Sequence, residues 1–278
     1  MTARTGSGGR PPLGQHFLQD PGWRRRILDQ LAHKPADCWL EIGAGHGEFT
    51  APLAEASRAV VAVERDRKLA GALRERLLSF PGARVLEADI LQLDVESLAR
   101  ELGTTKLRVY GSLPYYITSP ILRRLFDSLA VVEDIYVIVQ REVAERLVAK
   151  PRGSDYGYLS VLTQFHTEPE LMFVVPRGAF RPAPKVDSAL VRLAPPGARA
   201  KLQIADAQEF VRFLGACFRL KRKTLRNNLR PALPAARLQE ALAEVELAPH
   251  ARAEELPLGS LARLFAVVQR AGARFGGR

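Results

Sequence analysis

Short apolar runs alternate, through the first half of the chain, with stretches whose apolar residues recur at helical spacing. The runs lie at 38–42, 59–63, 84–86, 107–110 and 135–139, and helical spacing appears between them, as at 67–78 and 120–129. Regular alternation of strands and helices is typical of βαβ units and a parallel sheet. The pattern therefore predicts an α/β fold with a Rossmann-like sheet.

The second half of the chain follows a different pattern. Two further strands are expected at 171–175 and 188–193, forming an antiparallel edge on that sheet, and 194–197 (Ala-Pro-Pro-Gly) breaks the pattern. Helical spacing then dominates, at 206–218, 222–229, 235–244 and 258–269. We therefore predict a disordered tail at 1–12, an α/β domain at 13–197 and a small helical domain at 198–278.

Composition narrows the class of protein. No apolar run approaches the roughly 20 residues that a membrane span needs, and 1–12 lacks the apolar core of a secretory signal. Cys38 and Cys217 lie far apart, without His or Cys at ligand spacing, which argues against a disulfide framework and against a metal site. We expect a cytoplasmic protein that binds no membrane and no metal.

The charge is strongly basic and unevenly distributed. The formal net charge is +11, and residues 201–278 hold 14 Lys and Arg against 7 Asp and Glu. A basic excess of this size favours an anionic partner such as nucleic acid, although solubility alone is an alternative explanation.

A glycine-rich turn follows the first strong strand. The strand at 38–42 runs into Gly43-Ala44-Gly45-His46-Gly47, and Glu64 and Asp89 lie at the ends of the next two strands. Glycines allow a sharp turn and close approach of a ligand, while carboxylates at strand ends can accept ribose hydroxyls and an adenine amino group. The spacing is GxGxG rather than GxGxxG, so an adenosine cofactor is favoured over NAD.

A polar, proline-containing loop follows the fourth strand. It reads Gly111-Ser112-Leu113-Pro114-Tyr115-Tyr116. Adenine N6 is a poor nucleophile because its lone pair is delocalised into the ring, so acceptors placed against its N–H bonds help it to attack a methyl group. Ser112 and the Leu113 carbonyl, fixed by Pro114, suit that role, and Tyr115 can stack on an extruded base. The alternative is an ordinary turn with a buried tyrosine.

Two basic segments are candidates for RNA contact. Five cations recur at positions that would share one face of a helix, and no acid interrupts 210–230: Arg219, Arg222, Lys223, Arg226 and Arg230. Arg181 and Lys185 form a second basic loop beside two prolines. A solvated charged face and a rigid turn are the respective alternatives.

Six blocks together resemble the ribosomal RNA adenine dimethyltransferases, and most closely the bacterial small-subunit (dimethyladenosine transferase) family. They lie at 14–18, 41–45, 113–115, 156–160, 180–188 and 222–229, within a resemblance that spans about 14–270. It implies a class I methyltransferase domain with S-adenosylmethionine as cofactor, and a helical RNA-binding domain. It also implies dimethylation of two adjacent adenines near the 3′ end of small-subunit RNA, in an assembling 30S-type particle. A monomer is expected.

The same resemblance implies which residues contact the cofactor. They are His16, Leu18, Gly43, Glu64, Asp89 and Ser112, and Gly45 of the glycine-rich turn is a further candidate. The family usually has Asn where this chain has Ser112, and often Asn where it has His16. Serine is shorter and lacks an amide, which favours a role with weak catalysis as one alternative, while a large-subunit enzyme would share the cofactor and catalytic blocks but not the block at 222–229. Two alternatives thus stay open beside the small-subunit enzyme. One is a large-subunit dimethyltransferase of antibiotic-resistance type, and the other is an RNA-binding assembly factor with weak catalysis.

Overall fold

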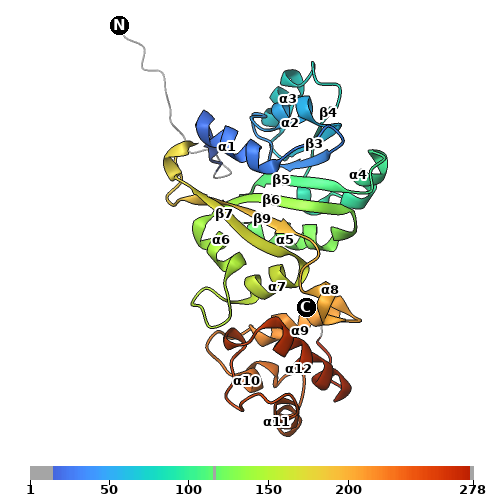
Figure 1. The fold of residues 1–278 in the computed structure, drawn as a ribbon, viewed down its shortest axis with the longest axis vertical. Coiled ribbons are helices and arrows are strands. Elements are labelled where there is room, and N and C mark those ends of the chain that lie inside the picture. The colour runs from blue at the N-terminus through green and yellow to red at the C-terminus, as the bar shows by residue number, and fades with distance from the viewer. Residues whose placement is uncertain (1–14, 115–116, 276–278) are drawn as a thin grey trace. The chain divides into compact units, whose positions relative to one another are not determined.

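The computed structural model describes residues 15–114 and 117–275 (Figure 1). The expected unordered tail at 1–12 and Tyr115 lie outside the described residues. A seven-stranded sheet has the order β4-β3-β2-β5-β6-β9-β7. The strands are β2 (Cys38–Ile42), β3 (Ala59–Glu64), β4 (Ala83–Glu87), β5 (Leu107–Ser112), β6 (Val132–Gln140), β7 (Glu168–Val175) and β9 (Ser188–Ala194). The α/β fold class is confirmed.

The first five strands of this sheet are parallel, which places their carboxyl ends along one edge. β2 pairs with β3 and β5, β3 with β4, and β5 with β6, all in parallel register. Each strand of this group except β4 is almost entirely buried, which explains its continuous apolar run in the sequence. The predicted edge strands also join this sheet, where β9 and β7 follow β6.

Helices follow the strands as the alternation predicted. Those of the first part of the chain are α1 (Pro21–Leu31), α2 (Thr50–Ala56), α3 (Arg67–Arg76), α4 (Val95–Glu101) and α5 (Thr118–Asp127). Asp20, Asp66 and Asp94 cap α1, α3 and α4 through side-chain oxygens that accept backbone N–H groups. These caps fix where each helix leaves its loop, and therefore where the loops lie at the edge of the sheet.

A buried cation holds β5 against the segment that follows α1. Arg108 donates to Asp37 at 2.8 Å and to the carbonyl of Ala32 at 3.1 Å. Its guanidinium also lies 4.5 Å from the centre of the Trp39 ring. A charged group is tolerated at this depth because its Nη1 and Nη2 atoms donate hydrogen bonds, to Asp37, Ala32 and Tyr136, and its plane is stacked on an aromatic ring.

The chain forms two compact units. Unit 1 comprises 1–141 and 173–190, and unit 2 comprises 142–172 and 191–278. Helices α6 (Arg141–Val148) and α7 (Tyr158–His166), apart from Arg141, therefore group with the C-terminal residues. The sequence predicted a single boundary between two domains, at 197. The two compact units instead exchange at 141/142, 172/173 and 190/191. The assignment of 198–278 as an RNA-binding domain stays a prediction.

Unit 2 is built on an aromatic core. Its later helices are α8 (Arg199–Leu202), α9 (Ala207–Cys217), α10 (Leu225–Leu229), α11 (Ala235–Glu244) and α12 (Leu258–Arg270). Phe165, Phe210, Phe213, Phe265 and Phe275 are all buried in one hydrophobic cluster. Phe165 belongs to α7, which explains why that helix groups with residues much later in the sequence.

Candidate functional site

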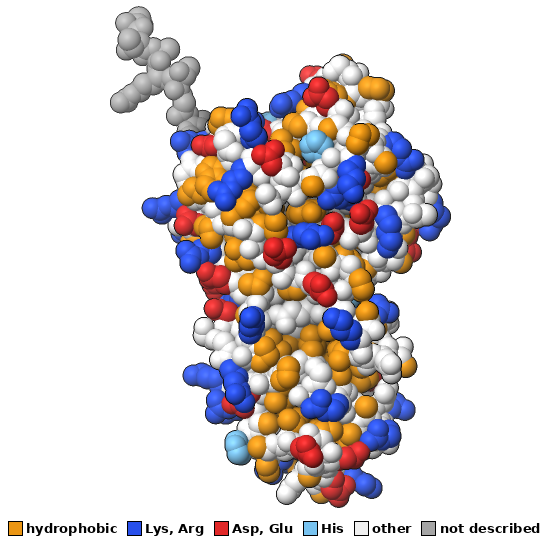
Figure 2. All heavy atoms as spheres, viewed as in Figure 1, with side chains coloured by type: hydrophobic (Ala, Val, Ile, Leu, Met, Phe, Trp, Pro, Cys, Tyr) orange, Lys and Arg blue, Asp and Glu red, His pale blue; other side chains and the backbone are white. Residues whose placement is uncertain are grey.

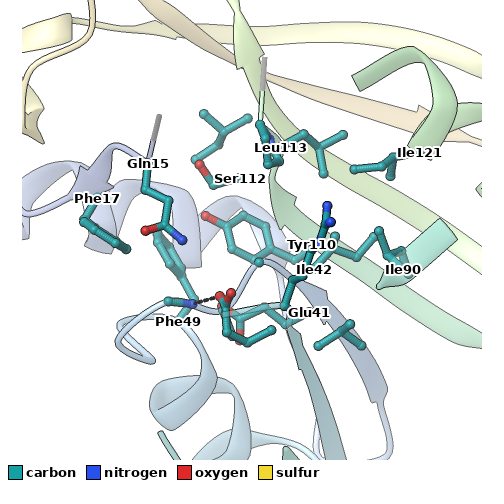
Figure 3. A pocket seen from close by; sticks show the side chains of 18 of the residues that line it. Gln15, Phe17, Glu41, Ile42, Phe49, Ile90, Tyr110, Ser112, Leu113 and Ile121 are labelled. Atoms are coloured by element: carbon teal, nitrogen blue, oxygen red, sulfur yellow. Dashed lines mark hydrogen bonds between the residues drawn. The ribbon is translucent and has the colours of Figure 1, made fainter. Parts of the chain in front are cut away.

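A pocket of unit 1 lies where the carboxyl ends of β2, β3 and β5 meet (Figure 3). The predicted cofactor residues all line it: His16, Leu18, Gly43, Gly45, Glu64, Asp89 and Ser112. Residues far apart in the sequence are thus brought together. The spacing of the motifs predicted this for the glycine turn, Glu64 and Asp89, and the resemblance implied it for His16, Leu18 and Ser112. Their role in binding stays a prediction.

The glycine-rich turn forms one wall of this pocket. Gly43 and Gly45 have φ angles of 71° and 57°, the left-handed region that favours glycine. A Cβ atom on Gly45 would lie 3.0 Å from the Phe17 ring, so a side chain there would also press on the N-terminal segment. Gly43 N–H donates to the carbonyl of Val63 at 2.8 Å, which ties the turn to β3.

Backbone amides hold the two predicted carboxylates in fixed orientations. Glu64 is 5% exposed, and its two oxygens accept from the N–H groups of Gly45 at 2.9 Å and Asp66 at 2.8 Å. Asp89 accepts from Leu91 N–H at 3.0 Å and lies 3.6 Å from the Arg65 guanidinium. Each carboxylate oxygen has two lone pairs, so both groups keep the capacity to accept further hydrogen bonds.

Two polar groups at the base of the pocket were missed by sequence reasoning. Glu41 lies inside β2, and burial raises its pKa to about 8, although the neighbouring Thr50 side chain opposes the shift. Tyr110 faces it from β5, and burial raises the pKa of its phenol well above the usual value. Glu41 Oε2 and the Tyr110 hydroxyl have no hydrogen-bond partner among the described residues. A carboxylate inside the apolar run Cys38–Ile42 is the sequence signal that could have revealed this end of the pocket.

The predicted catalytic loop begins at the last residue of β5. Figure 3 shows the Ser112 side chain facing the same cavity as Tyr110. Leu113 N–H donates to the Ile138 carbonyl at 3.0 Å, while the Pro114 carbonyl accepts from Ile117 N–H and the Thr118 hydroxyl, both at 3.2 Å. These bonds fix the backbone around Ser112 and Leu113, as positioning of acceptors requires.

The N-terminal segment closes one side of the pocket by pairing with the predicted basic loop. Strand β1 (Phe17–Leu18) is antiparallel to β8 (Phe180–Arg181), and His16 Nδ1 lies 2.7 Å from the Pro182 carbonyl. Because a carbonyl only accepts, this ring nitrogen donates. Arg181 and Lys185 are exposed, and the loop that carries them lies between pocket residues Phe180 and Ser188.

The prediction that five cations share one helical face is wrong. Helix α9 ends at Cys217, Arg222 has a left-handed φ of 66°, and α10 begins only at Leu225, capped by Thr224. A helix cannot pass through a residue of this conformation. Tertiary hydrogen bonds cause the break, because the Asn228 side chain binds both N–H and C=O of Leu220, at 2.9 and 3.2 Å. The cations are still exposed: Arg219, Arg222, Lys223, Arg226 and Arg230.

The described residues contain neither a metal-ligand cluster nor a membrane-spanning helix. Across 15–114 and 117–275, no three His, Cys, Asp or Glu side chains are grouped as metal ligands would be. In the same residues, no helix combines the length and the apolarity that crossing a membrane requires.

An adenosine cofactor fits the pocket. The glycine turn admits a ligand close to the backbone, two oriented carboxylates lie at successive strand ends, and two buried polar groups lack partners at its base. Carboxylates accept hydrogen bonds from ribose hydroxyls and an adenine amino group, and their negative charge disfavours a pyrophosphate. The arrangement is therefore suited to a nucleoside that carries no phosphate.

Known proteins resemble this chain over nearly its whole length. The family model described as ribosomal RNA adenine dimethylase matches residues 6–270. A Koribacter versatilis protein named ribosomal RNA small subunit methyltransferase A is 40% identical over 263 residues, which cover 91% of this chain and 92% of that protein.

Two solved structures share the fold. A dimethyladenosine transferase from Plasmodium falciparum superposes with a TM-score of 0.79 at 23% identity, covering 94% of this chain and all of that one. The 23S rRNA methyltransferase ErmE superposes with a TM-score of 0.64 at 28% identity, covering 91% and 99%. Because the family model matches far more than half of the sequence, this chain belongs to the ribosomal RNA adenine dimethylase family.

Proposed function

We propose that this protein dimethylates N6 of two adjacent adenines near the 3′ end of small-subunit ribosomal RNA, within an assembling 30S-type particle. That it is a ribosomal RNA adenine methyltransferase follows from its family, and S-adenosylmethionine is the methyl donor. The observation that carries the small-subunit target is the 40% identity, over nine tenths of both chains, to a relative with that name.

The pocket residues would hold the cofactor in the following way. Glu64 would accept from the ribose hydroxyls and Asp89 from the adenine amino group, with the glycine turn against the remainder of the molecule. When bound, the cofactor supplies a methyl group on a sulfonium centre, which is electrophilic without further activation. The protein's own task is therefore to prepare and position the nucleophile.

Ser112 and the Leu113 carbonyl would prepare the target adenine. Hydrogen bonds from N6–H to these two acceptors favour a pyramidal amine whose lone pair points at the methyl group. Pro114 restricts the backbone between them and the next helix, and its own carbonyl is occupied by Thr118 and Ile117. We expect Tyr115 to stack on the extruded base.

Methyl transfer to two substrates tests the target. Immature small subunits should accept methyl groups from labelled cofactor, and naked large-subunit RNA should not. Mapping of dimethyladenosine in ribosomal RNA from cells with and without the protein would locate the modified positions. Loss of methylation in large-subunit RNA alone would replace the proposal by a large-subunit target.

A binding role with weak catalysis is the second candidate, and it depends on Ser112. The shorter side chain would place its acceptor farther from the target N6 than asparagine would. Under this reading the purified protein would bind immature small subunits but would transfer methyl groups to them slowly or not at all. We expect a cytoplasmic monomer in either case.

A further inference from the structure

Two loops of unit 2, far apart in the sequence, are anchored on one acidic residue. Glu254 accepts from Arg152 N–H through its backbone carbonyl at 2.8 Å and from Arg222 N–H through its carboxylate at 3.1 Å. Both arginines have left-handed backbones, with φ of 72° and 66°. The loop 149–157 between α6 and α7 therefore lies beside the loop 218–224 that precedes α10.

The exposed side chains of both loops are mainly cationic. They are Lys150 and Arg152 in the first loop, and Arg219, Lys221, Arg222 and Lys223 in the second. None of them lies within 4 Å of a carboxylate of the described residues, whereas Arg146, Arg212, Arg237 and Arg270 of the same unit do. Figure 2 shows Lys and Arg side chains gathered at the edge where the α6–α7 loop lies in Figure 1.

These cations are more suited to an anionic partner than to structural pairing. Asp155 is the exposed acid of the first loop, and the second loop has none. Glu254 is only partly exposed, and its carboxylate is directed at a backbone N–H. Unpaired exposed cations in one place create the positive potential that binds polyanions.

The surface fits a phosphate backbone better than an acidic protein. Protein interfaces have a core of apolar and aromatic side chains. In the two loops, Leu220 is the large apolar side chain that is exposed, at 45%. Binding to phosphates needs no such core, because released counterions supply the affinity.

We infer that Lys150 and Arg152 bind RNA phosphates and extend, across Glu254, the surface formed by the loop 218–224. The inference rests on the proposed function, since it takes ribosomal RNA as the ligand. It adds a second chain segment, between α6 and α7, to the candidate contacts that the sequence identified.

The test is the salt dependence of RNA binding by the full-length protein. The double variant Lys150→Gln with Arg152→Gln should bind small-subunit RNA more weakly and lower the slope of log K against log salt by nearly two units, since each phosphate contact contributes about 0.9. The matched control, Arg237→Gln with Arg263→Gln, removes the same charge elsewhere in unit 2 and should keep the parent slope. Arg152→Lys, which retains the charge, should retain most of the affinity.

Each other result has a defined meaning. An unchanged slope in the Lys150 and Arg152 variant would overturn the inference, as would an equal fall in the control pair, which would indicate net charge alone. If naked RNA binds both proteins equally but the immature particle binds the variant more weakly, the partner is an acidic protein and the inference is wrong. If the parent protein binds neither RNA nor particle, the proposed function fails instead.

Discussion

At the scale of single residues, Ser112 has the most direct consequence for chemistry. It ends β5, faces the pocket and occupies the position where the resemblance noted in the sequence leads us to expect asparagine. If its hydroxyl accepts from the target N6–H, that contact matters most as the amine becomes pyramidal, so its removal should affect rate more than binding.

We therefore predict that Ser112→Ala lowers the methylation rate by on the order of 10²–10³, the usual effect of losing one oriented hydrogen bond in a transition state. RNA affinity should change little. Ser112→Asn should keep or raise the rate, because it restores a longer acceptor. Single-turnover methyl transfer to immature small subunits, at saturating cofactor, measures both. Equal rates for parent and Ser112→Ala would leave positioning to the Leu113 carbonyl.

Glu41 is a second residue with a measurable signature, because its pKa of about 8 lies far above the ordinary 4.5. The unfolded chain releases this proton above about 4.5, while the folded protein keeps it until about 8. Burial of the neutral acid thus contributes stability that is fully present below 4.5 and is lost as the pH rises through this window. The slope approaches about 1.4 kcal/mol per pH unit.

Denaturant unfolding of the cofactor-free protein at pH 5, 6.5 and 8 tests this prediction. Glu41→Gln cannot ionise, so its stability relative to the parent should improve steadily toward pH 8. Glu55→Gln, which removes an exposed carboxylate from α2, should follow the parent. Parallel curves for Glu41→Gln and the parent would mean that Glu41 ionises normally in the folded protein.

At the scale of elements, the sequence predicted the features that depend on local pattern. It missed the features that depend on contacts between distant residues. Periodicity predicts the strand at 38–42 and the glycine turn after it. Spacing predicts that Glu64 and Asp89 lie near that turn, because neighbouring parallel strands end at one edge of the sheet. The break between α9 and α10 does not, since it depends on Asn228 and Glu254 binding the backbone of an otherwise helical segment.

The same limit applies to the grouping of α6 and α7 with unit 2, and to Tyr110. Phe165 of α7 packs on Phe210, with ring centres 4.9 Å apart. The local sequence of neither helix predicts that contact. Tyr110 reads as one more apolar residue of a buried strand, and only the register of β5 with β2 places it opposite Glu41.

The loop 218–224 supports a prediction of its own, because Asn228 holds it through two hydrogen bonds to Leu220. Asn228→Ala leaves every cation in place but frees the loop, so RNA binding must then order it again. We expect weaker RNA affinity at unchanged net charge, together with a lower melting temperature. Asn227→Ala, an exposed neighbour in the same helix, is the matched control and should alter neither. Unchanged affinity in Asn228→Ala would show that the loop needs no fixed conformation to bind.

At the scale of the whole molecule, the candidate cofactor site and the C-terminal cations belong to different compact units. The pocket is lined by residues of unit 1, while Arg219 to Arg230 lie in unit 2. Substitutions in one unit should therefore alter one binding reaction and leave the other unchanged, apart from effects on folding.

The triple variant Arg222→Gln, Lys223→Gln and Arg226→Gln tests this separation. Each lost phosphate contact should reduce the slope of log K against log salt by nearly one unit, so RNA affinity should fall most at low salt, where counterion release contributes most. Affinity for S-adenosylmethionine, measured by calorimetry on the same protein, should equal that of the parent. An unchanged salt slope would mean that these side chains form only a solvated surface. A parallel loss of cofactor affinity would mean that the two units do not bind independently, and RNA docking would then be coupled to the pocket.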